Sequence, residues 1–348
     1  MISSKNEKMT KHRYAIAACA RWENDFIVEW LTYYQIIGYD HIYLYCNDDN
    51  PSELYEKILP FATGKNPFVT FHYWKEQGKH RDMMLHFVDC YLNEVEWISF
   101  FDIDEFLRLP AGASIGGFMA DFEDRADSVL FNWVFFGPNG HKTHPGTPVL
   151  STYVRREPGI HPLTKHVTRA EVFREGSFRT ICLDNSFVHR ITGFTNFPIR
   201  SMNVLGDDMT DYFEGFPDRA INFNEADDRQ TRLFATAAVH HYAFRSEKAF
   251  WDRSARGLKG DYRGEKMWTD LAEGDGFAGF LENVNRIEDT RLADQWVAWV
   301  RRANELVVVA DPIEAAARAA GLPWPLPPIT EDSFDWTNFE HPMKAFVA

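Results

Sequence analysis

The sequence predicts an α/β fold: a mostly parallel, Rossmann-like sheet flanked by helices, followed by a helical extension at the C-terminus. Strand and helix signals alternate through the first hundred residues, as in parallel strands joined by right-handed crossovers. The run Trp97–Phe101 is apolar on both faces, which is typical of a central strand covered by helices. It ends in three carboxylates, Asp102, Asp104 and Glu105. Because ligands of open α/β sheets bind beyond the carboxyl ends of such strands, we expect a ligand site there.

The other early elements follow from residue type and spacing. Four more strands are predicted, at 14–20, 41–46, 68–74 and 128–136. A helix between the first two begins at a cap formed by Asn24 or Asp25. Ser52 is expected to cap a second helix, 52–59, and a third helix covers roughly 79–93.

The later sequence is less regular. Short strands and loops are predicted between 151 and 224, and helix returns near 246–257. We therefore expect a flexible N-terminus at 1–13, one main domain at 14–257, and a helical extension with a proline-rich tail at 258–348. Neither a GxGxxG dinucleotide motif nor a GxxxxGK[ST] phosphate loop occurs, so any nucleotide must be bound in another way.

Composition and charge exclude several classes of protein. The net charge of −14 argues against a broad surface for nucleic acid. No segment approaches the ~18 consecutive apolar residues of a membrane span, and residues 1–13 lack the apolar core of a signal peptide. Cys19, Cys46 and Cys90 lie in apolar or strand-like runs and form no CxxC pair, which predicts buried reduced thiols and no structural zinc. We expect a cytoplasmic protein, with peripheral membrane contact left open.

The acidic triplet is the strongest candidate site. Carboxylates such as Asp102 and Asp104 are hard oxygen ligands that suit Mg²⁺ or Mn²⁺, and these cations suit a diphosphate. The alternative is a solvated turn or a helix cap. The position directly after a buried strand favours the metal site.

Two further polar clusters accompany the triplet. Asn47, Asp48 and Asp49 end the second strand on the same edge of the sheet, either as an Asx turn or as acceptors for a nucleoside. His240 and His241 follow a short apolar run and offer a late metal ligand, with a buried core histidine as the alternative.

Separate blocks spread over 14–257 share their order and spacing with a known family. They are Cys19–Asn24, Glu29–Leu31, Gly38–Ile42, Asn47–Asp49, Trp97, Asp102–Phe106, Trp133–Gly137, Lys165, and His241–Tyr242 with Ser246. Together they resemble glycosyltransferase family 92 and the related bacterial glycosyl transferase family 2-like proteins, which have the GT-A fold. Two positions depart from the family pattern: Glu23-Asn24 stands in reversed order, and His240 replaces the usual Asn.

The resemblance implies a sugar transferase, expected to be a hexosyltransferase, with a UDP-sugar donor and a divalent cation, Mn²⁺ or Mg²⁺. It implies that Asp102 contacts the ribose or the metal and that Asp104 ligates the metal, which makes these two the catalytic residues. His241 is implied as the late metal ligand, with His240 as its substitute. The implied donor-binding residues are Arg21, Glu23, Asn47, Asp48, Asp102, Ile103, Trp133 and Lys165. The acceptor is a hydroxyl group of a glycan or glycoconjugate.

Glycosyl transfer sets further requirements. A cation stabilises the charge that the departing diphosphate gains, and Lys165 or Arg169 would neutralise more of it unless they are merely solvated. The resemblance points to inversion, which needs a carboxylate base opposite the leaving group. The candidate bases are Asp184, Asp207, Asp208, Asp211 and Glu225, with Asp208 favoured. Among Trp133, Phe135 and Phe136, strand alternation allows only some side chains to face a sugar.

Three other functions remain open from sequence. A metal-dependent phosphohydrolase acting on nucleotide sugars would use the same aspartates, but normally gathers more His and Asp ligands for two metals. A non-catalytic glycan-binding protein on a GT-A scaffold would not need Asp102, Asp104 and His241. A glycoside hydrolase requires two facing carboxylates, which one loop does not present. The sequence names neither the sugar nor the acceptor nor the linkage.

Overall fold

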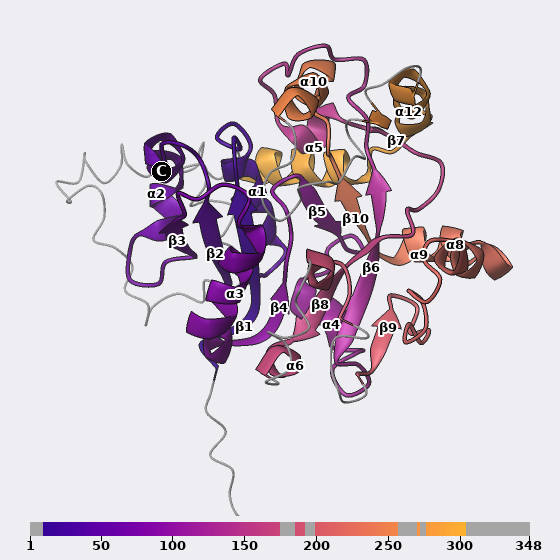
Figure 1. Cartoon of the computed structure of the whole chain (residues 1–348), viewed down its shortest axis with the longest axis horizontal. Coiled ribbons are helices and arrows are strands. Elements are labelled where there is room, and N and C mark those ends of the chain that lie inside the picture. Colours follow the sequence, from indigo (N-terminus) through magenta and orange to yellow (C-terminus); the bar gives the residue numbers. More distant parts are fainter. Residues whose placement is uncertain (1–9, 175–184, 192–198, 257–269, 272–275, 304–348) are drawn as a thin grey trace, which may run out of the picture.

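The structure is a computed structural model that describes residues 10–174, 185–191, 199–256, 270–271 and 276–303 (Figure 1). A nine-stranded sheet runs through it in the order β3-β2-β1-β4-β8-β6-β10-β5, and β9 also pairs with β6. The strands are β1 (His12–Ala20), β2 (His41–Cys46), β3 (Val69–Tyr73), β4 (Val95–Ser99), β5 (Glu105–Arg108), β6 (Ser128–Phe135), β8 (Thr164–Arg169), β9 (Ser201–Asn203) and β10 (Ala238–His241).

The first four strands form the predicted parallel unit. β1 pairs in parallel with β2 and β4, and β2 with β3. The sheet changes direction at β8, which lies antiparallel between β4 and β6. β6 pairs in parallel with β10 and β9, whereas β5 is antiparallel to β10. The prediction of a mostly parallel sheet is confirmed, but the antiparallel insertion of β8 was not predicted.

Helices cover both faces of the sheet. They are α1 (Ile27–Ile36), α2 (Ser52–Ala62), α3 (His80–Cys90), α4 (Ile115–Met119), α5 (Val149–Thr152), α6 (Ala170–Arg174), α8 (Asp218–Glu225), α9 (Arg229–Thr236), α10 (Glu247–Arg256) and α12 (Gly276–Val284), with 3₁₀ turns at Leu92–Glu94, Asn185–Val188 and Ala226–Asp228. Ile16 and Ala18 of β1 face α1, α2 and α4, whereas Ala15 and Ala17 face α3 and α6. This alternation is the reason why β1 is apolar on both faces.

Two predicted helix caps were wrong. Neither Asn24 nor Asp25 caps α1, because the N–H groups of Phe26 and Ile27 both donate to the Glu23 carbonyl at 3.0 Å. Ser52 does not cap α2 either, since it is the first residue of the helix and its N–H donates to Asn50 Oδ1 at 3.0 Å. The acceptor is therefore a backbone carbonyl before α1 and the side chain of Asn50 before α2.

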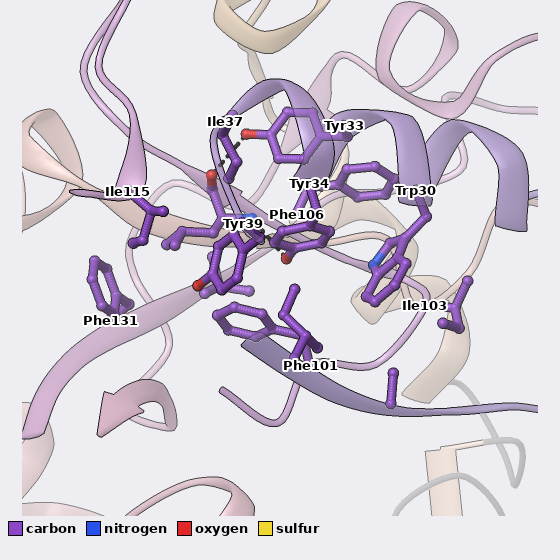
Figure 2. Close-up of a cluster of buried hydrophobic side chains, with 14 of the residues drawn as sticks. Trp30, Tyr33, Tyr34, Ile37, Tyr39, Phe101, Ile103, Phe106, Ile115 and Phe131 are labelled. Carbon is purple, nitrogen blue, oxygen red and sulfur yellow. Dashed lines mark hydrogen bonds between the residues drawn. The ribbon is translucent and has the colours of Figure 1, made fainter. Parts of the chain in front are cut away.

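Aromatic side chains of α1 anchor the start of β5 (Figure 2). Trp30 Nε1 and the Tyr34 hydroxyl both donate to the Glu105 carbonyl, at 2.9 and 3.0 Å. The Tyr34 hydroxyl also accepts from Leu107 N at 3.2 Å, and the Tyr33 hydroxyl donates to the Leu107 carbonyl at 2.7 Å. All three rings are buried. The position of the acidic segment therefore depends on α1.

Part of the predicted C-terminal extension is continuous with the main domain. β11 (Ile287–Glu288) pairs antiparallel with β7 (Arg155–Arg156), and the helix at 291–303 places Trp296 in the main core. Asp289 accepts hydrogen bonds from Arg156 and Arg291 at 2.9 and 2.6 Å. Most of the predicted flexible N-terminus and the proline-rich tail lie outside the described residues.

The structure describes three of the four cysteines. Cys46 is buried as predicted, Cys19 is half-buried, and Cys90 is exposed because it ends α3 on the solvent side. Cys182 lies outside the described residues. Among the helices that the structure describes, none combines the length and the apolar character needed to cross a membrane.

Replacing Tyr34 tests the link between α1 and β5. Tyr34→Phe is expected to lower the free energy of unfolding by about 1–3 kcal/mol, because it leaves the buried Leu107 N–H without its acceptor. Urea denaturation measures the loss. Tyr55→Phe, at an exposed tyrosine of α2, should change stability by less than about 0.5 kcal/mol. Equal stability of both variants would contradict the proposed anchor.

Candidate active site

The acidic segment forms a closed turn between β4 and β5. Asp102 N donates to Glu105 Oε2 at 3.0 Å, and Glu105 N donates back to the Asp102 carbonyl at 3.1 Å. The Asp104 carbonyl accepts from Tyr242 N at 2.8 Å, which ties the turn to the end of β10. The turn therefore presents Asp102 and Asp104 from a rigid backbone at the carboxyl edge of the sheet.

Lys165 of β8 neutralises one side of this turn. Its ammonium group lies 3.0 Å from Asp102 Oδ2, 3.3 Å from Glu105 Oε2 and 3.0 Å from the Phe100 carbonyl. The Lys165 side chain is 1% exposed, whereas that of Asp102 is 44% exposed. Burial works against the charged lysine, but Asp102 and Glu105 outweigh it and raise the pKa of Lys165. Lys165 thus binds the turn from its buried side, whereas Asp102 stays open to solvent.

Asp104 faces a different group of basic side chains. Its Oδ2 lies 3.5 Å from His241 Nε2 and 3.6 Å from Arg253 Nη1. Burial favours the neutral form of this carboxyl, but His241, Arg253 and Arg245 outweigh it and hold the pKa of Asp104 well below its ordinary value. Asp104 is therefore a carboxylate at neutral pH.

Arg245 links this group to the end of β1. It donates to Glu23 Oε2 at 2.7 Å and to the Ile103 carbonyl at 3.2 Å. Burial raises the pKa of Glu23 although Arg245 opposes the effect. Arg245 and Arg253 are residues that sequence reasoning missed, because an arginine in or before an amphipathic helix has no signal that distinguishes it from a solvated one.

The two late histidines point to opposite sides of β10. His241 contacts Trp133 and Phe135, with ring centroids 4.5 and 4.8 Å apart, and lies beside Asp104. His240 stacks on Phe136 at 4.4 Å on the other side. Strand alternation therefore makes His241, and not His240, the histidine that can share a ligand with Asp104.

The same alternation determines which aromatic residues of β6 face the site. Trp133 and Phe135 lie on the His241 side, together with two histidines that the sequence did not single out. The His161 ring is 5.2 Å from Phe135, and the His189 ring is 4.8 Å from Trp133. Burial lowers the pKa of His161 to about 4, so this imidazole is neutral at pH 7. Phe136 packs away from the site.

The predicted nucleoside-binding residues lie at the ends of β1 and β2. Asn47 donates to the carbonyl groups of Trp74 and Glu76, at 2.6 and 2.9 Å. Asp48 Oδ1 accepts from Trp22 N at 2.7 Å, and Arg21 donates to the Asn47 carbonyl. The Asx-turn alternative fails for Asn47, since its side chain bonds to the segment after β3.

Arg169 does not join the site. It pairs in register with Trp97 in the middle of β4, and its guanidinium covers the Trp97 ring at 4.3 Å. This end of β8 is opposite to the end that carries Lys165. The hypothesis that Arg169 neutralises a diphosphate was therefore wrong.

The favoured base, Asp208, also lies elsewhere. Its Oδ1 accepts from Thr210 N and Oγ1 at 2.8 and 2.6 Å, in a turn beside Met202 and hence next to the start of β6. These hydrogen bonds hold its pKa below the ordinary value. Two other candidates are engaged in ion pairs, Asp207 with Arg229 and Asp211 with Arg219. Glu225 ends α8 and is exposed, and Asp184 lies outside the described residues.

The donor set at this edge matches a hard or borderline divalent cation. Asp104 and His241 supply an oxygen and a nitrogen 3.5 Å apart, and Asp102 follows on the same turn. Mn²⁺ and Mg²⁺ accept such carboxylate-rich sets. Within the ranges that the structure describes, no three His, Cys, Asp or Glu side chains are already grouped around one point. Asp102 pairs with Lys165 through Oδ2, so Oδ1 is the oxygen with which it would complete the set.

Comparison with known proteins points to one family. Residues 14–175 match glycosyltransferase family 92. A family 92 protein of Ricinus communis is 25% identical over 165 residues, covering 44% of this chain and 28% of that protein. A family 92 protein of Oryza sativa subsp. japonica is 24% identical over 155 residues, covering 44% of this chain and 26% of that protein. The chain therefore spans about a quarter of the length of these curated relatives.

Solved structures show only a loose overall likeness. S. aureus TarS 1–349 in complex with UDP is 13% identical, with a TM-score of 0.30, and the match covers 48% of this chain and 49% of that one. The glycosyltransferase GlyE of Streptococcus pneumoniae TIGR4 is 14% identical, with a TM-score of 0.34, and the match covers 80% and 66%.

Removing Lys165 tests the charge balance of the turn. Lys165→Met is expected to lower the free energy of unfolding by about 3–5 kcal/mol, because it leaves Glu105 buried without a countercharge. Burial raises the pKa of Glu105 well above its ordinary value. A carboxyl group with a raised folded-state pKa favours folding at low pH and loses this contribution as pH rises. The loss should therefore be smaller at pH 5 than at pH 8.

The double variant Lys165→Met/Glu105→Gln is the matched control. It should recover most of the lost stability at pH 8, because no unpaired charge remains buried. Urea denaturation at both pH values compares the variants. An equal, pH-independent loss in the single and double variants would show that Lys165 contributes only packing.

Proposed function

We propose that this protein transfers a sugar from a nucleotide-sugar donor, a UDP-sugar, to a hydroxyl group of a glycan or glycoconjugate, with inversion, because residues 14–175 match glycosyltransferase family 92. One observation carries the proposal. The turn that bears Asp102 and Asp104 lies at the carboxyl edge of the sheet, where ligands of open α/β sheets bind. The expected cytoplasmic location stays a prediction.

The charges around the turn suit a diphosphate. Arg245, Arg253 and His241 lie on the side of Asp104. Cations held in place before the reaction, as the two arginines are, stabilise the charge that develops on a leaving diphosphate, at no cost in reorganisation. Lys165 contributes indirectly, because it is buried and paired with Asp102. We assign Lys165 a positioning role, and we assign diphosphate contact to the two arginines.

We further propose that Mn²⁺ or Mg²⁺ binds at Asp104 and His241, with Asp102 as the third ligand. When bound, the cation supplies Lewis-acid stabilisation of the leaving diphosphate. The Trp133 and Phe135 rings beside His241 keep water away from this imidazole and offer flat apolar surface to a sugar.

Transfer is better supported than phosphohydrolysis. Two-metal hydrolases gather additional His and Asp ligands around their acidic residues. Here the described neighbours of the turn are mainly basic side chains: Lys165 next to Asp102, and His241 and Arg253 next to Asp104. This arrangement favours holding a diphosphate over activating a water molecule at a second metal.

Asp104→Asn tests the central residue of the site. It should lower the rate of transfer by about a hundredfold or more, because it removes the charge that holds the cation and orients the diphosphate. Release of UDP from a panel of UDP-sugars, with and without glycan acceptors, measures the rate. Asp208→Asn should leave the rate unchanged. Full activity of Asp104→Asn would exclude the assignment, and release without dependence on acceptor would favour hydrolysis.

The two histidines give a matched test of metal binding. Mn²⁺ and UDP together should raise the melting temperature more than either does alone, because both bind the native state. His241→Ala should abolish the added shift, and His240→Ala should retain it, each measured against the ligand-free variant. Chelation by EDTA should remove the shift from the wild type. A shift that survives His241→Ala would place the cation elsewhere.

A further inference from the structure

Three imidazole rings lie around the Trp133 indole of β6. The ring centroids of His241, His189 and His161 are 4.5, 4.8 and 6.0 Å from that of Trp133. His241 is the proposed metal ligand, but the proposed function gives His161 and His189 no role. We call Trp133, His161 and His189 the histidine cluster.

The backbone around β6 and β8 fixes the positions of both histidines. His161 N donates to the Trp133 carbonyl at 2.7 Å, and Trp133 N donates to the Leu163 carbonyl at 3.0 Å. Thr164 of β8 holds the other histidine, because its Oγ1 donates to the His189 carbonyl at 2.6 Å. The two rings are therefore positioned before any ligand binds, as recognition of a specific group requires.

The hydrogen bonds of the two Nδ1 atoms give the imidazoles opposite tautomers. Leu163 N donates to His161 Nδ1 at 3.1 Å, so the proton of this neutral ring is on Nε2. His189 Nδ1 lies 3.1 Å from the Thr164 carbonyl, which can only accept, so here Nδ1 carries the proton and Nε2 keeps its lone pair. Burial lowers the pKa of His161 to about 4 and that of His189 to about 3, which keeps both rings neutral.

The cluster thus offers one fixed donor and one fixed acceptor. Among the described residues, neither the Nε2–H of His161 nor the Nε2 of His189 has a hydrogen-bond partner. Trp133 adds a second donor: the residue is 7% exposed, and its Nε1 is buried with no partner in the described part of the chain. A buried tryptophan N–H usually finds an acceptor, and leaving it without one is costly. These groups match a ligand with several hydroxyls, since each hydroxyl both donates and accepts.

The position of Trp133 indicates which hydroxyl-bearing molecule the cluster would contact. Its ring contacts His241, the neighbour of Asp104, and lies 5.9 Å from the ammonium of Lys165, the partner of Asp102. Trp133 is therefore close to the partners of both aspartates. A sugar attached to a diphosphate at Asp104 and His241 would lie beside this ring, nearer than the rest of the donor.

We propose that His161 and His189 determine the specificity for the transferred sugar: His161 Nε2–H donates to one sugar hydroxyl, His189 Nε2 accepts from another, and Trp133 Nε1–H donates to a sugar oxygen. The inference rests on the proposed function and deepens it, because it selects an uncharged hexose with free hydroxyl groups. A uronic acid would place its carboxylate against neutral imidazoles, one of which presents a lone pair, so it would lack a countercharge.

The test uses the full chain with Mn²⁺ and measures the affinities of UDP, UDP-glucose and UDP-galactose by calorimetry. The UDP-hexose that binds the wild type more tightly serves as the probe, and it should bind more tightly than UDP. His161→Phe and His189→Phe keep a ring beside Trp133 but remove the ring nitrogens. Each should weaken the probe by about three- to tenfold, the effect of one net hydrogen bond. UDP affinity should stay unchanged, because UDP has no sugar to contact the cluster.

Three comparisons sharpen the test. His161→Gln and His189→Gln should recover part of the probe affinity, because the glutamine amide can donate or accept near the former Nε2. His72→Phe makes the same ring exchange at a half-buried histidine of β3, an edge strand of the sheet, and should change neither affinity. UDP-glucuronic acid should bind the wild type no more tightly than UDP.

The outcomes separate this inference from the proposed function. If the wild type transfers sugar but both phenylalanine variants bind the probe as tightly as it does, or if the probe binds no more tightly than UDP, the assignment is wrong and the proposed function stands. Equal losses for UDP and the probe would make the histidines structural and also overturn the assignment. A raised KM for the glycan acceptor with unchanged probe affinity would place the acceptor at the cluster and likewise overturn it. If the wild type binds neither UDP nor a UDP-hexose, both proposals fail.

Discussion

The buried ion pairs of Lys165 with Asp102 and Glu105 are the constraint on which the candidate site depends. Glu105 is completely buried, and burial raises its pKa well above the ordinary value although Lys165 opposes this shift. The Lys165 ammonium lies 3.3 Å from Glu105 and reaches Asp102 at 3.0 Å in the same position. A buried charge without its partner costs several kcal/mol, so the turn and β8 stabilise each other. The antiparallel insertion of β8 between β4 and β6 is what brings Lys165 there.

This arrangement divides the charges of the turn between two sides. Asp102 pairs with the buried Lys165, whereas Asp104 points to His241 and Arg253. The protein as a whole carries a net charge of −14, and at this edge Lys165, Arg245 and Arg253 each lie beside a carboxylate. A diphosphate bound here would meet cations that are already held in place.

The sequence predicted well what depends on local pattern. The parallel strands of the first half, the helices between them and the acidic turn after β4 follow from hydrophobic periodicity and from one motif. It missed contacts between residues that are distant in the chain. Lys165 meets residues about 60 positions earlier, and Arg253 meets Asp104 about 150 positions earlier, and no spacing rule predicts such contacts. The α1 cap failed because the Glu23 carbonyl replaced a side chain, and Asp208 failed because its carboxylate serves its own turn.

A crystal structure of the protein with Mn²⁺ and UDP tests the central claim most directly. The account predicts the cation bound to Asp104 and His241, with the diphosphate between that cation and the arginines. A cation or diphosphate bound away from Asp104, with the turn still closed on Lys165 and His241, would contradict it.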